Sequence, residues 1–255
     1  MGIKDKIILG SNPIILDIGT YDGKDSIEFL DMYEDARVFA FEADSRSIDL
    51  FKHSINSTEN MKKLINYYNL NCKSSLNSLY ERVNGDSLVL VEKAIANIDG
   101  KTTFYQSQQI PPLSISEKDR GIKEWSASSS INKPKNHLNM TMRGDEQIVE
   151  FDESIDVDSI KLDTWFSQQS DIDIIDFVWA DVNGGEKEMI SGGVNTFKNN
   201  VQYLYTEYSD NELMEGQPNL NEIIEMLEVF ELVYQDRNGI KNMYGNALLK
   251  NKNLA

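Results

Sequence analysis

Two buried strand-like runs near the start of the chain, each followed by a different kind of residue, constrain the fold most. The first run, Ile14–Ile18, leads into Gly19 and a short segment that ends in Gly23. The second run, residues 38–41, is followed by Glu42. Continuous apolar residues without alternation are typical of parallel strands buried on both faces. A glycine turn after one such strand and an acid after the next predict a ligand site at the carboxyl ends of a parallel sheet.

The spacing of the glycines indicates which ligand this site holds. Asp17, Gly19 and Gly23 form the pattern D-x-G-x-x-x-G, whereas dinucleotide sites carry G-x-G-x-x-G. We therefore expect S-adenosylmethionine. Gly19 lets the backbone approach the ligand where a Cβ would collide. Glu42 is expected to accept hydrogen bonds from both ribose hydroxyls, each contributing about 1.5–3 kcal/mol. Asp17 or Asp22 is expected to face the ammonium group of the cofactor.

Three further residues complete the predicted cofactor site on this side of the sheet. Tyr21 lies in the glycine turn, and Ala43 follows the ribose acid. A third buried run, residues 87–91, is followed by residues 92–94, and the end of a third strand is the expected wall for adenine. Glu92, Lys93 and Ala94 are therefore the candidates for contact with adenine. For the charged side chains of Glu92 and Lys93, exposure to solvent is the alternative role.

Composition restricts the class of protein and of partner. The 255 residues suit one large α/β domain or two small ones, and we expect a single domain over residues 1–255. A net charge of -17 disfavours binding of extended nucleic acid, because phosphates would be repelled. With one cysteine and two histidines, neither a cysteine-based nor a multi-histidine metal site is expected.

The first apolar stretch, residues 7–16, is too short to cross a membrane and is interrupted by Gly10 and Pro13. It also lacks the small-residue cleavage pattern of a leader peptide. These features predict a cytoplasmic protein without membrane insertion.

Strand-like runs alternate with helical spacing along the rest of the chain, the pattern of a doubly wound, mostly parallel sheet. Further strands are predicted at residues 174–180 and 203–206, and an antiparallel pair at the sheet edge is predicted at residues 230–234 and 247–249. Asp163 is expected to cap a short helix.

Residues 106–150 break this alternation. They contain two adjacent prolines and a serine-rich stretch that ends at Ser130. Loops of this length in compact domains are usually lids, binding loops or linkers. We expect residues 97–160 to form an inserted hairpin followed by a substrate-covering loop, with an interdomain linker as the alternative.

The chain resembles the FkbM family of methyltransferases from about residue 14 to residue 249. Four segments carry the resemblance: residues 16–23, 94–101, 161–165 and 176–186. The last is the most specific, being similar to the family block D-x-x-K-x-D-V-E-G-x-E. The resemblance implies a Rossmann-like, seven-stranded methyltransferase fold with helices on both faces. It also implies S-adenosylmethionine as methyl donor and a hydroxyl acceptor on a sugar, glycan or small natural product.

The sequence departs from the family pattern at two positions of that block. Trp179 stands where the family often has lysine, and Asn183 stands where it often has glutamate, whereas Asp181, Gly184 and Glu186 are retained. Asparagine keeps a hydrogen-bonding side chain but has no charge and cannot accept a proton.

Transfer of a methyl group to a hydroxyl benefits from a general base, typically by roughly 10²–10⁴-fold. Asp181 and Glu207 each follow a predicted strand and are the first candidates, Asp181 also as a cofactor contact. The alternatives are that Asp181 orders the following turn and that Glu207 caps a helix. His137 in the loop is a third candidate, since its ordinary pKa suits a base, although loop histidines are often surface residues. Carboxylates here could also hold a divalent cation, but no metal is expected.

Two other functions compete with methyl transfer. An NAD-linked, sugar-modifying Rossmann enzyme is disfavoured by the glycine spacing and by the lack of a Tyr-x-x-x-Lys pair. A non-catalytic module with the same fold would agree with the changes at Trp179 and Asn183. However, a scaffold has no need of the predicted ribose acid Glu42.

Overall fold

The computed structural model of the chain describes residues 7, 9–110, 126–135, 148–238 and 244–254. The strands of this part are β1 (Ile14–Ile18), β2 (Arg37–Phe41), β3 (Leu88–Val91), β4 (Ala94–Ile95), β5 (Gly100–Ile110), β6 (Ile148–Ile160), β7 (Ile175–Ala180), β8 (Val201–Ser209), β9 (Phe230–Asn238) and β10 (Tyr244–Asn251). Its helices are α1 (Lys24–Met32), α2 (Ser45–Ile55), α3 (Thr58–Tyr67), α4 (Leu76–Val83), α6 (Leu162–Ser167), α7 (Glu186–Gly192), α8 (Val194–Asn200) and α9 (Leu220–Met226).

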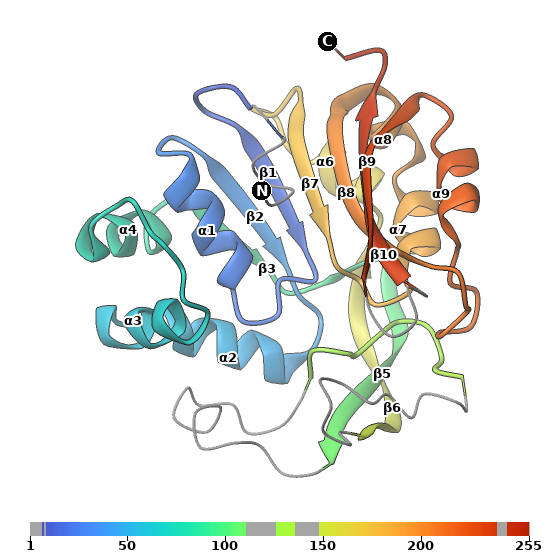
Figure 1. Ribbon diagram of the computed structural model, residues 1–255, viewed down its shortest axis with the longest axis horizontal. Helices are drawn as coiled ribbons and strands as arrows, with labels where there is room; N and C mark the ends of the chain where they lie inside the picture. The colour runs from blue at the N-terminus through green and yellow to red at the C-terminus, as the bar shows by residue number, and fades with distance from the viewer. Residues whose placement is uncertain (1–6, 8, 111–125, 136–147, 239–243, 255) are drawn as a thin grey trace.

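The main sheet has seven strands in the order β3-β2-β1-β7-β8-β10-β9 (Figure 1). Neighbouring strands from β3 to β8 are parallel, and β10 is antiparallel to both β8 and β9. The predicted Rossmann-like, mostly parallel sheet is therefore confirmed. β9 and β10 form the antiparallel pair that was expected at the sheet edge, and β9 is the edge strand. The strand order reverses between β1 and β7, and ligands of open α/β sheets bind at the carboxyl ends next to such a switch point.

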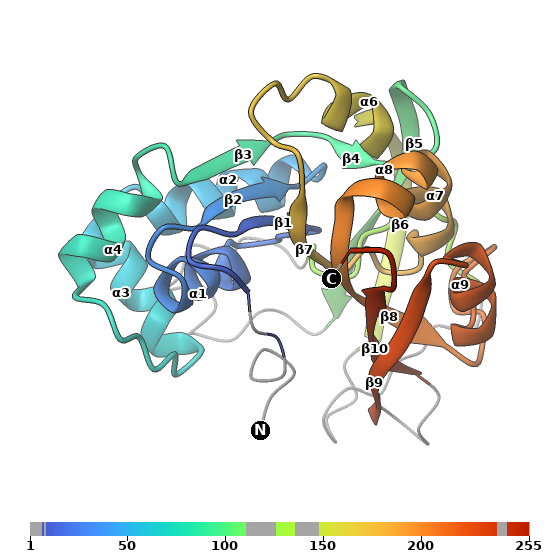
Figure 2. The same cartoon turned by 90° about the horizontal axis from the view of Figure 1, so that it is seen from above.

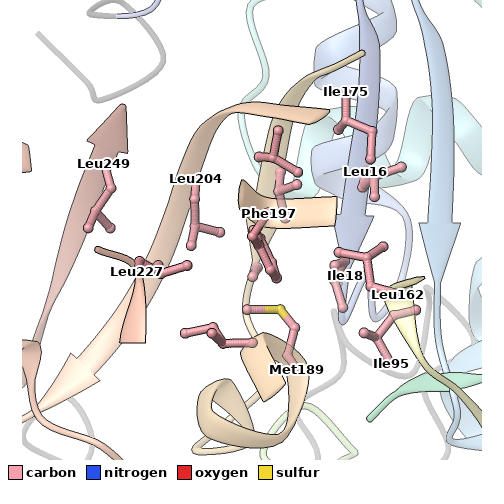
Figure 3. Packing of buried hydrophobic residues seen from close by; sticks show 14 of the residues in the cluster. Leu16, Ile18, Ile95, Leu162, Ile175, Met189, Phe197, Leu204, Leu227 and Leu249 are labelled. Carbon is pink, nitrogen blue, oxygen red and sulfur yellow. The ribbon is translucent and has the colours of Figure 1, made fainter. Parts of the chain in front are cut away.

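Both faces of the main sheet are covered because side chains alternate along its strands. Leu16 and Ile18 face α6–α9 and join one buried cluster, whereas Ile15 faces α1–α4 and joins another. Figure 2 shows the two groups of helices on opposite sides of the sheet. Figure 3 shows how Met189 of α7 and Phe197 of α8 pack in the first cluster. Burial of each large apolar side chain contributes about 1.5–3 kcal/mol.

A smaller sheet in the order β4-β6-β5 projects beyond the main sheet (Figure 1). β5 and β6 form a long antiparallel pair, and β4 runs parallel to β6. Residues 126–135 lie between these two strands in the sequence, and Ser130 forms a bridge to Tyr105 of β5. A hairpin followed by a loop was expected over residues 97–160; β5 and β6 are the antiparallel strands of that range, and the long insertion lies between them in the sequence.

Two local predictions were wrong. Asp163 does not cap its own helix, since the N-cap of α6 is Lys161. Its carboxylate instead accepts hydrogen bonds from the backbone N–H groups of Asn195 and Thr196, at the start of α8. Glu207 does not end a strand either. Pairing of β8 with the antiparallel β10 extends β8 to Ser209, so that Glu207 lies within the strand.

Candidate active site

A cavity of about 240 Å³ lies at the carboxyl ends of β1 and β2, next to the switch point. Its wall comes from the turn after β1, from the ends of β2 and β7, from β4 and β5, and from residues 126–131. The predicted cofactor residues that line it are Gly19, Tyr21, Asp22, Glu42, Ala43, Ala94 and Asp181.

Glu42 joins the ends of β1 and β2 at this cavity. Its carboxylate accepts backbone hydrogen bonds from Tyr21 (3.0 Å), Ala43 (2.8 Å) and Asp44 (2.9 Å), which fix its orientation. The side chain is 9% exposed. Desolvation raises the pKa of Glu42 to about 7, and the three backbone donors oppose that rise. Two hydroxyl donors from a ribose would favour the charged form further.

The two glycines of the turn are required for different reasons. Gly19 has φ +84°, and a Cβ built on it would lie 1.9 Å from the backbone oxygen of Asp181. Gly23 has φ +83°, and its Cβ would lie 2.6 Å from the ring of Phe51 in α2. Gly19 therefore allows the turn to approach the end of β7 at the cavity. Gly23 does not line the cavity but lets α2 pack against the start of α1.

Asp17 also lies outside the cavity wall. It is 1% exposed, and its carboxylate accepts hydrogen bonds from the hydroxyls of Thr20 (2.7 Å) and Ser26. These bonds turn Asp17 inward, so its expected contact with the cofactor's ammonium group finds no support in the geometry. Asp22 does line the cavity, where its carboxylate accepts a hydrogen bond from the hydroxyl of Tyr68 at 2.8 Å.

Residues 126–135, which we call the roof segment, cover the cavity on the side of β5. At one end the segment is attached to the start of α2. The hydroxyls of Ser126 and Ser47 lie 2.8 Å apart, and Ser129 donates a hydrogen bond to Asp44 at 3.1 Å. Asp44 also forms an ion pair with Arg46 at 2.6 Å. The serine-rich composition of this stretch thus reflects a buried hydroxyl network.

The roof segment is held at its middle by the loop after β7. The side-chain amide of Asn183 donates to the carbonyl of Ala127 at 3.1 Å, and that of Asn132 donates to the carbonyl of Gly184 at 2.8 Å. Beyond these contacts, Pro134 forms a bridge to Met214 in the loop after β8. Asn183 therefore attaches the roof segment to the end of β7, a role that the sequence did not indicate.

Two carboxylates without hydrogen-bond partners among the described residues lie side by side, one directly after β7 and the other within β8. The register that pairs Ala180 with Thr206 places Asp181 beside Glu207. Asp181 is open to the cavity, although the surrounding protein desolvates it. This desolvation, followed by repulsion from Glu207, raises the pKa of Asp181. The pair therefore retains a proton to higher pH than an isolated carboxyl group, as a general base near neutral pH requires.

Glu186 is a third carboxylate close to this pair, at the start of α7. It is 0% exposed, and its Oε1 accepts a hydrogen bond from the backbone N–H of Gly184 at 3.2 Å. Its Oε2 has no partner among the described residues. Burial raises the pKa of Glu186 to about 7, which favours a neutral carboxyl group that supports the loop after β7.

Two other expectations concern a possible base and a possible metal site. His137 lies outside the described residues, so its role as a base stays a prediction. In the part of the chain that the structure describes, no group of three or more histidines, cysteines or acids is placed to hold a metal ion.

No described helix has both the length and the apolar character needed to cross a membrane.

Two comparisons with known proteins identify the family of the chain. The family model of the methyltransferase FkbM domain matches residues 17–236. The 2-O-methyltransferase NoeI of Sinorhizobium fredii (strain NBRC 101917 / NGR234) is 35% identical over 243 residues, which cover 95% of this chain and 81% of that protein.

Solved structures are more distant. The methyltransferase FkbM from Methylobacillus flagellatus KT has a TM-score of 0.48 at 10% identity, covering 96% of this chain. This chain spans only 44% of that structure. The precorrin-6y C5,15-methyltransferase from Geobacter metallireducens GS-15 has a TM-score of 0.42 at 12% identity, covering 96% of this chain and 85% of that one. The assignment therefore rests on the matched family model and on the 35% identical relative. The chain belongs to the FkbM family of S-adenosylmethionine-dependent methyltransferases.

Proposed function

We propose that the chain methylates a hydroxyl group of a sugar, glycan or small natural product and that Asp181 is the general base. One observation carries this proposal. Asp181 lines the cofactor cavity, and its carboxylate has no hydrogen-bond partner among the described residues. S-adenosylmethionine supplies the electrophilic methyl group when it is bound. The 35% identical relative is a 2-O-methyltransferase, which supports oxygen as the acceptor atom.

The residues of the cavity suit this cofactor. Glu42 is oriented by three backbone donors, so its two oxygens are placed to accept the ribose hydroxyls. Ala94 of β4, which follows β3 in the sequence, lines the wall, where its methyl group would contact adenine. Gly19 leaves the space that a Cβ would fill between β1 and β7. These residues would hold the donor with its reactive end toward the end of β7.

The two carboxylates beside the cavity, Asp181 and Glu207, would remove the proton of the acceptor hydroxyl. Asp181 would accept the proton of the acceptor hydroxyl, because burial and the nearby Glu207 raise its pKa and so favour the protonated form that this transfer produces. Glu207 lies one strand further from the cavity and would share that proton or bind a second hydroxyl of the acceptor. The roof segment, which lies within the 97–160 insertion, would exclude water from this site.

The charge of the chain supports a small acceptor over a nucleic acid. The carboxylates beside the cavity would repel a phosphate backbone, which binds through positive groups. An acceptor with several hydroxyl donors matches them better. The single cysteine of the sequence supports a cytoplasmic location.

A transfer assay tests the proposal. Purified protein is incubated with S-adenosylmethionine labelled in its methyl group and with a panel of mono- and oligosaccharides and hydroxylated natural products. We expect label on a hydroxyl oxygen of at least one acceptor. Asp181→Asn should lower kcat by about 10²–10⁴-fold and flatten its dependence on pH, whereas the exposed Glu228→Gln should not. Label found only on nitrogen or sulfur acceptors, or an unchanged kcat in Asp181→Asn, would contradict the proposal.

A further inference from the structure

The hydroxyl of Ser159, in the small sheet, is buried and has no hydrogen-bond partner among the described residues. The whole residue is only 2% exposed. The large majority of buried polar atoms in folded proteins have a hydrogen-bond partner, so a buried hydroxyl without one needs a specific explanation. The proposed proton transfer does not use Ser159. The position of this residue in β6 shows from which side a partner would come.

Strand pairing places Ser159 on the face of the small sheet that is turned toward the cofactor cavity. Ser159 pairs with Ala94 of β4 on one side and with Gly100 of β5 on the other. Side chains alternate along a strand, and paired residues of neighbouring strands share a face. Phe104, four residues after Gly100 in β5, therefore lies on the same face as Ser159. Ala94 and Phe104 both line the cavity, so this is the cavity face of the small sheet.

The opposite face of the small sheet packs against the main core or is exposed to solvent. Ile95 and Ile160 lie on that face and belong to the buried cluster that contains α7, where Figure 3 shows Ile95. Further along β6, Ser154 and Asp158 of the same face are exposed. The side chain of Ser159 therefore leaves the sheet on the side of the cavity, away from the main core.

The part of the cavity wall nearest to Ser159 is apolar. Ala43, Ala94 and Phe104 contribute hydrocarbon side chains to it, whereas Glu42 is oriented for the ribose hydroxyls. Binding sites for small molecules are mostly apolar, with a few polar groups that provide specificity. The 6-amino group of adenine is a donor, and none of the three apolar side chains can accept from it.

Ser159 does not line the cavity of the free protein, because it lies one strand behind Ala94. Neighbouring strands are about 4.8 Å apart, so the two side chains stand about that far from each other. Alanine has only a methyl group at this place. A base that rests on Ala94 can therefore bring its amino edge over Ser159.

We propose that Ser159 selects adenine as the base of the cofactor, its hydroxyl oxygen accepting a hydrogen bond from the 6-amino group. Ala94 and Phe104 contact the ring beside it. The amino group supplies the partner that this buried hydroxyl lacks in the free protein. Ser159 acts at the base and not at the sulfonium, so it changes affinity for the cofactor and not the transfer step. This inference concerns the cofactor and does not depend on which acceptor is methylated.

Two ligands that differ only in the 6-amino group test this assignment. One is S-adenosylhomocysteine, and the other is its analogue with hydrogen in place of that group. The affinity of each is measured by calorimetric titration. We expect the wild type to bind S-adenosylhomocysteine about three- to tenfold more tightly than the analogue, as one neutral hydrogen bond predicts. In Ser159→Ala this preference should fall to within about twofold, because affinity for S-adenosylhomocysteine decreases while affinity for the analogue is unchanged.

Ser154→Ala is the matched control, because it removes a hydroxyl from the exposed face of the same strand. This variant should keep the full preference for S-adenosylhomocysteine. Thermal unfolding without ligand tests a structural role for Ser159. Since its hydroxyl has no partner in the described part of the free protein, the Tm of Ser159→Ala should equal or exceed that of the wild type.

Three results would overturn the assignment of Ser159. They are equal binding of the two ligands by the wild type, an undiminished preference in Ser159→Ala, and a lower Tm of that variant without ligand. If neither ligand binds to the wild type, the cofactor site itself is contradicted. Failure to find a hydroxyl acceptor, by contrast, would contradict the proposed function and leave the role of Ser159 supported by the binding data.

Discussion

The side-chain amide of Asn183 donates a hydrogen bond to the carbonyl of Ala127 at 3.1 Å and so attaches the roof segment to the end of β7. Asn183 has φ +48°, a backbone conformation that asparagine adopts more readily than most residues. The FkbM family often has glutamate at the position of Asn183, and a carboxylate cannot donate a hydrogen bond to a carbonyl. The asparagine therefore replaces a charge by a contact that closes the cavity.

Replacing Asn183 by glutamate should loosen the roof segment. The change removes one hydrogen bond, worth about 0.5–1.5 kcal/mol, and sets a carboxylate against a carbonyl oxygen. We expect amide hydrogen exchange in residues 126–132 to become faster, and affinity for S-adenosylhomocysteine to fall by about two- to tenfold. Asn221→Glu, on the exposed start of α9, is the control. Unchanged exchange in residues 126–132 of Asn183→Glu would show that the contact does not hold the segment.

Gly19 should tolerate no side chain. A Cβ at this residue would overlap the backbone oxygen of Asp181, and its φ of +84° is strained for any L residue. We expect Gly19→Ala to abolish measurable binding of S-adenosylhomocysteine and to lower the free energy of unfolding by more than about 1 kcal/mol. Gly216→Ala is a matched control, because Gly216 has φ +81° but open space around its Cβ position. If both variants lost cofactor affinity to a similar extent, backbone strain, and not overlap with the backbone of Asp181, would be the cause.

Glu186 should make the protein less stable as the pH rises. Its pKa of about 7 in the folded chain exceeds the ordinary value of 4.5, so the folded protein binds more protons than the unfolded chain between these values. This contribution to stability is complete below pH 4.5 and is lost as the pH rises through 7, at about 1.4 kcal/mol per pH unit. Glu186→Gln keeps an acceptor for Gly184 and has no charge to bury. Its Tm should therefore exceed that of the wild type at pH 8 and match it at pH 5.

The control for this pH series is Glu225→Gln on the exposed side of α9, whose Tm should follow the wild type throughout. Thermal unfolding is measured at several pH values by circular dichroism. A Tm of Glu186→Gln that falls between pH 5 and pH 8 as steeply as that of the wild type would contradict the raised pKa of Glu186.

Glu42 should also make cofactor binding depend on pH. Its pKa of about 7 in the free protein means that the ionised form, which accepts the ribose hydroxyls, is incompletely populated below neutrality. Affinity for S-adenosylhomocysteine should therefore increase between pH 6 and pH 8, by less than tenfold per pH unit for one proton. Glu42→Gln should show a weaker affinity without this dependence. A wild-type affinity that is constant over the same range would exclude Glu42 as the group that titrates.

The sequence predicted the parts of the fold that depend on local pattern. Ile14–Ile18 is β1 residue for residue, because a buried parallel strand has a continuous apolar run with glycine after it. The apolar run of residues 174–180 likewise predicted β7, which spans Ile175–Ala180. By contrast, Asp163 was assigned to its own helix because capping was inferred from spacing, whereas its carboxylate contacts α8 through tertiary packing.

Contacts between distant segments account for the rest of what was missed. The extension of β8 past Glu207 depends on pairing with β10, some forty residues later. The attachment of Ala127 to Asn183 joins residues 56 positions apart. Asp17 is an exception that depends on local contacts: it matched the cofactor pattern by position, but the hydroxyls of Thr20 and Ser26, three and nine residues later, turn its carboxylate inward.

The central claim is that Glu42 and the glycine turn form a site for S-adenosylmethionine, and calorimetric titration of S-adenosylhomocysteine tests it most directly. We expect an affinity in the micromolar range, about −8 kcal/mol, for the wild type. Glu42→Ala should weaken it about tenfold or more, because two charge-assisted hydrogen bonds are lost. Glu228→Ala should bind as the wild type does. No binding by the wild type, or equal affinity in Glu42→Ala, would contradict the account.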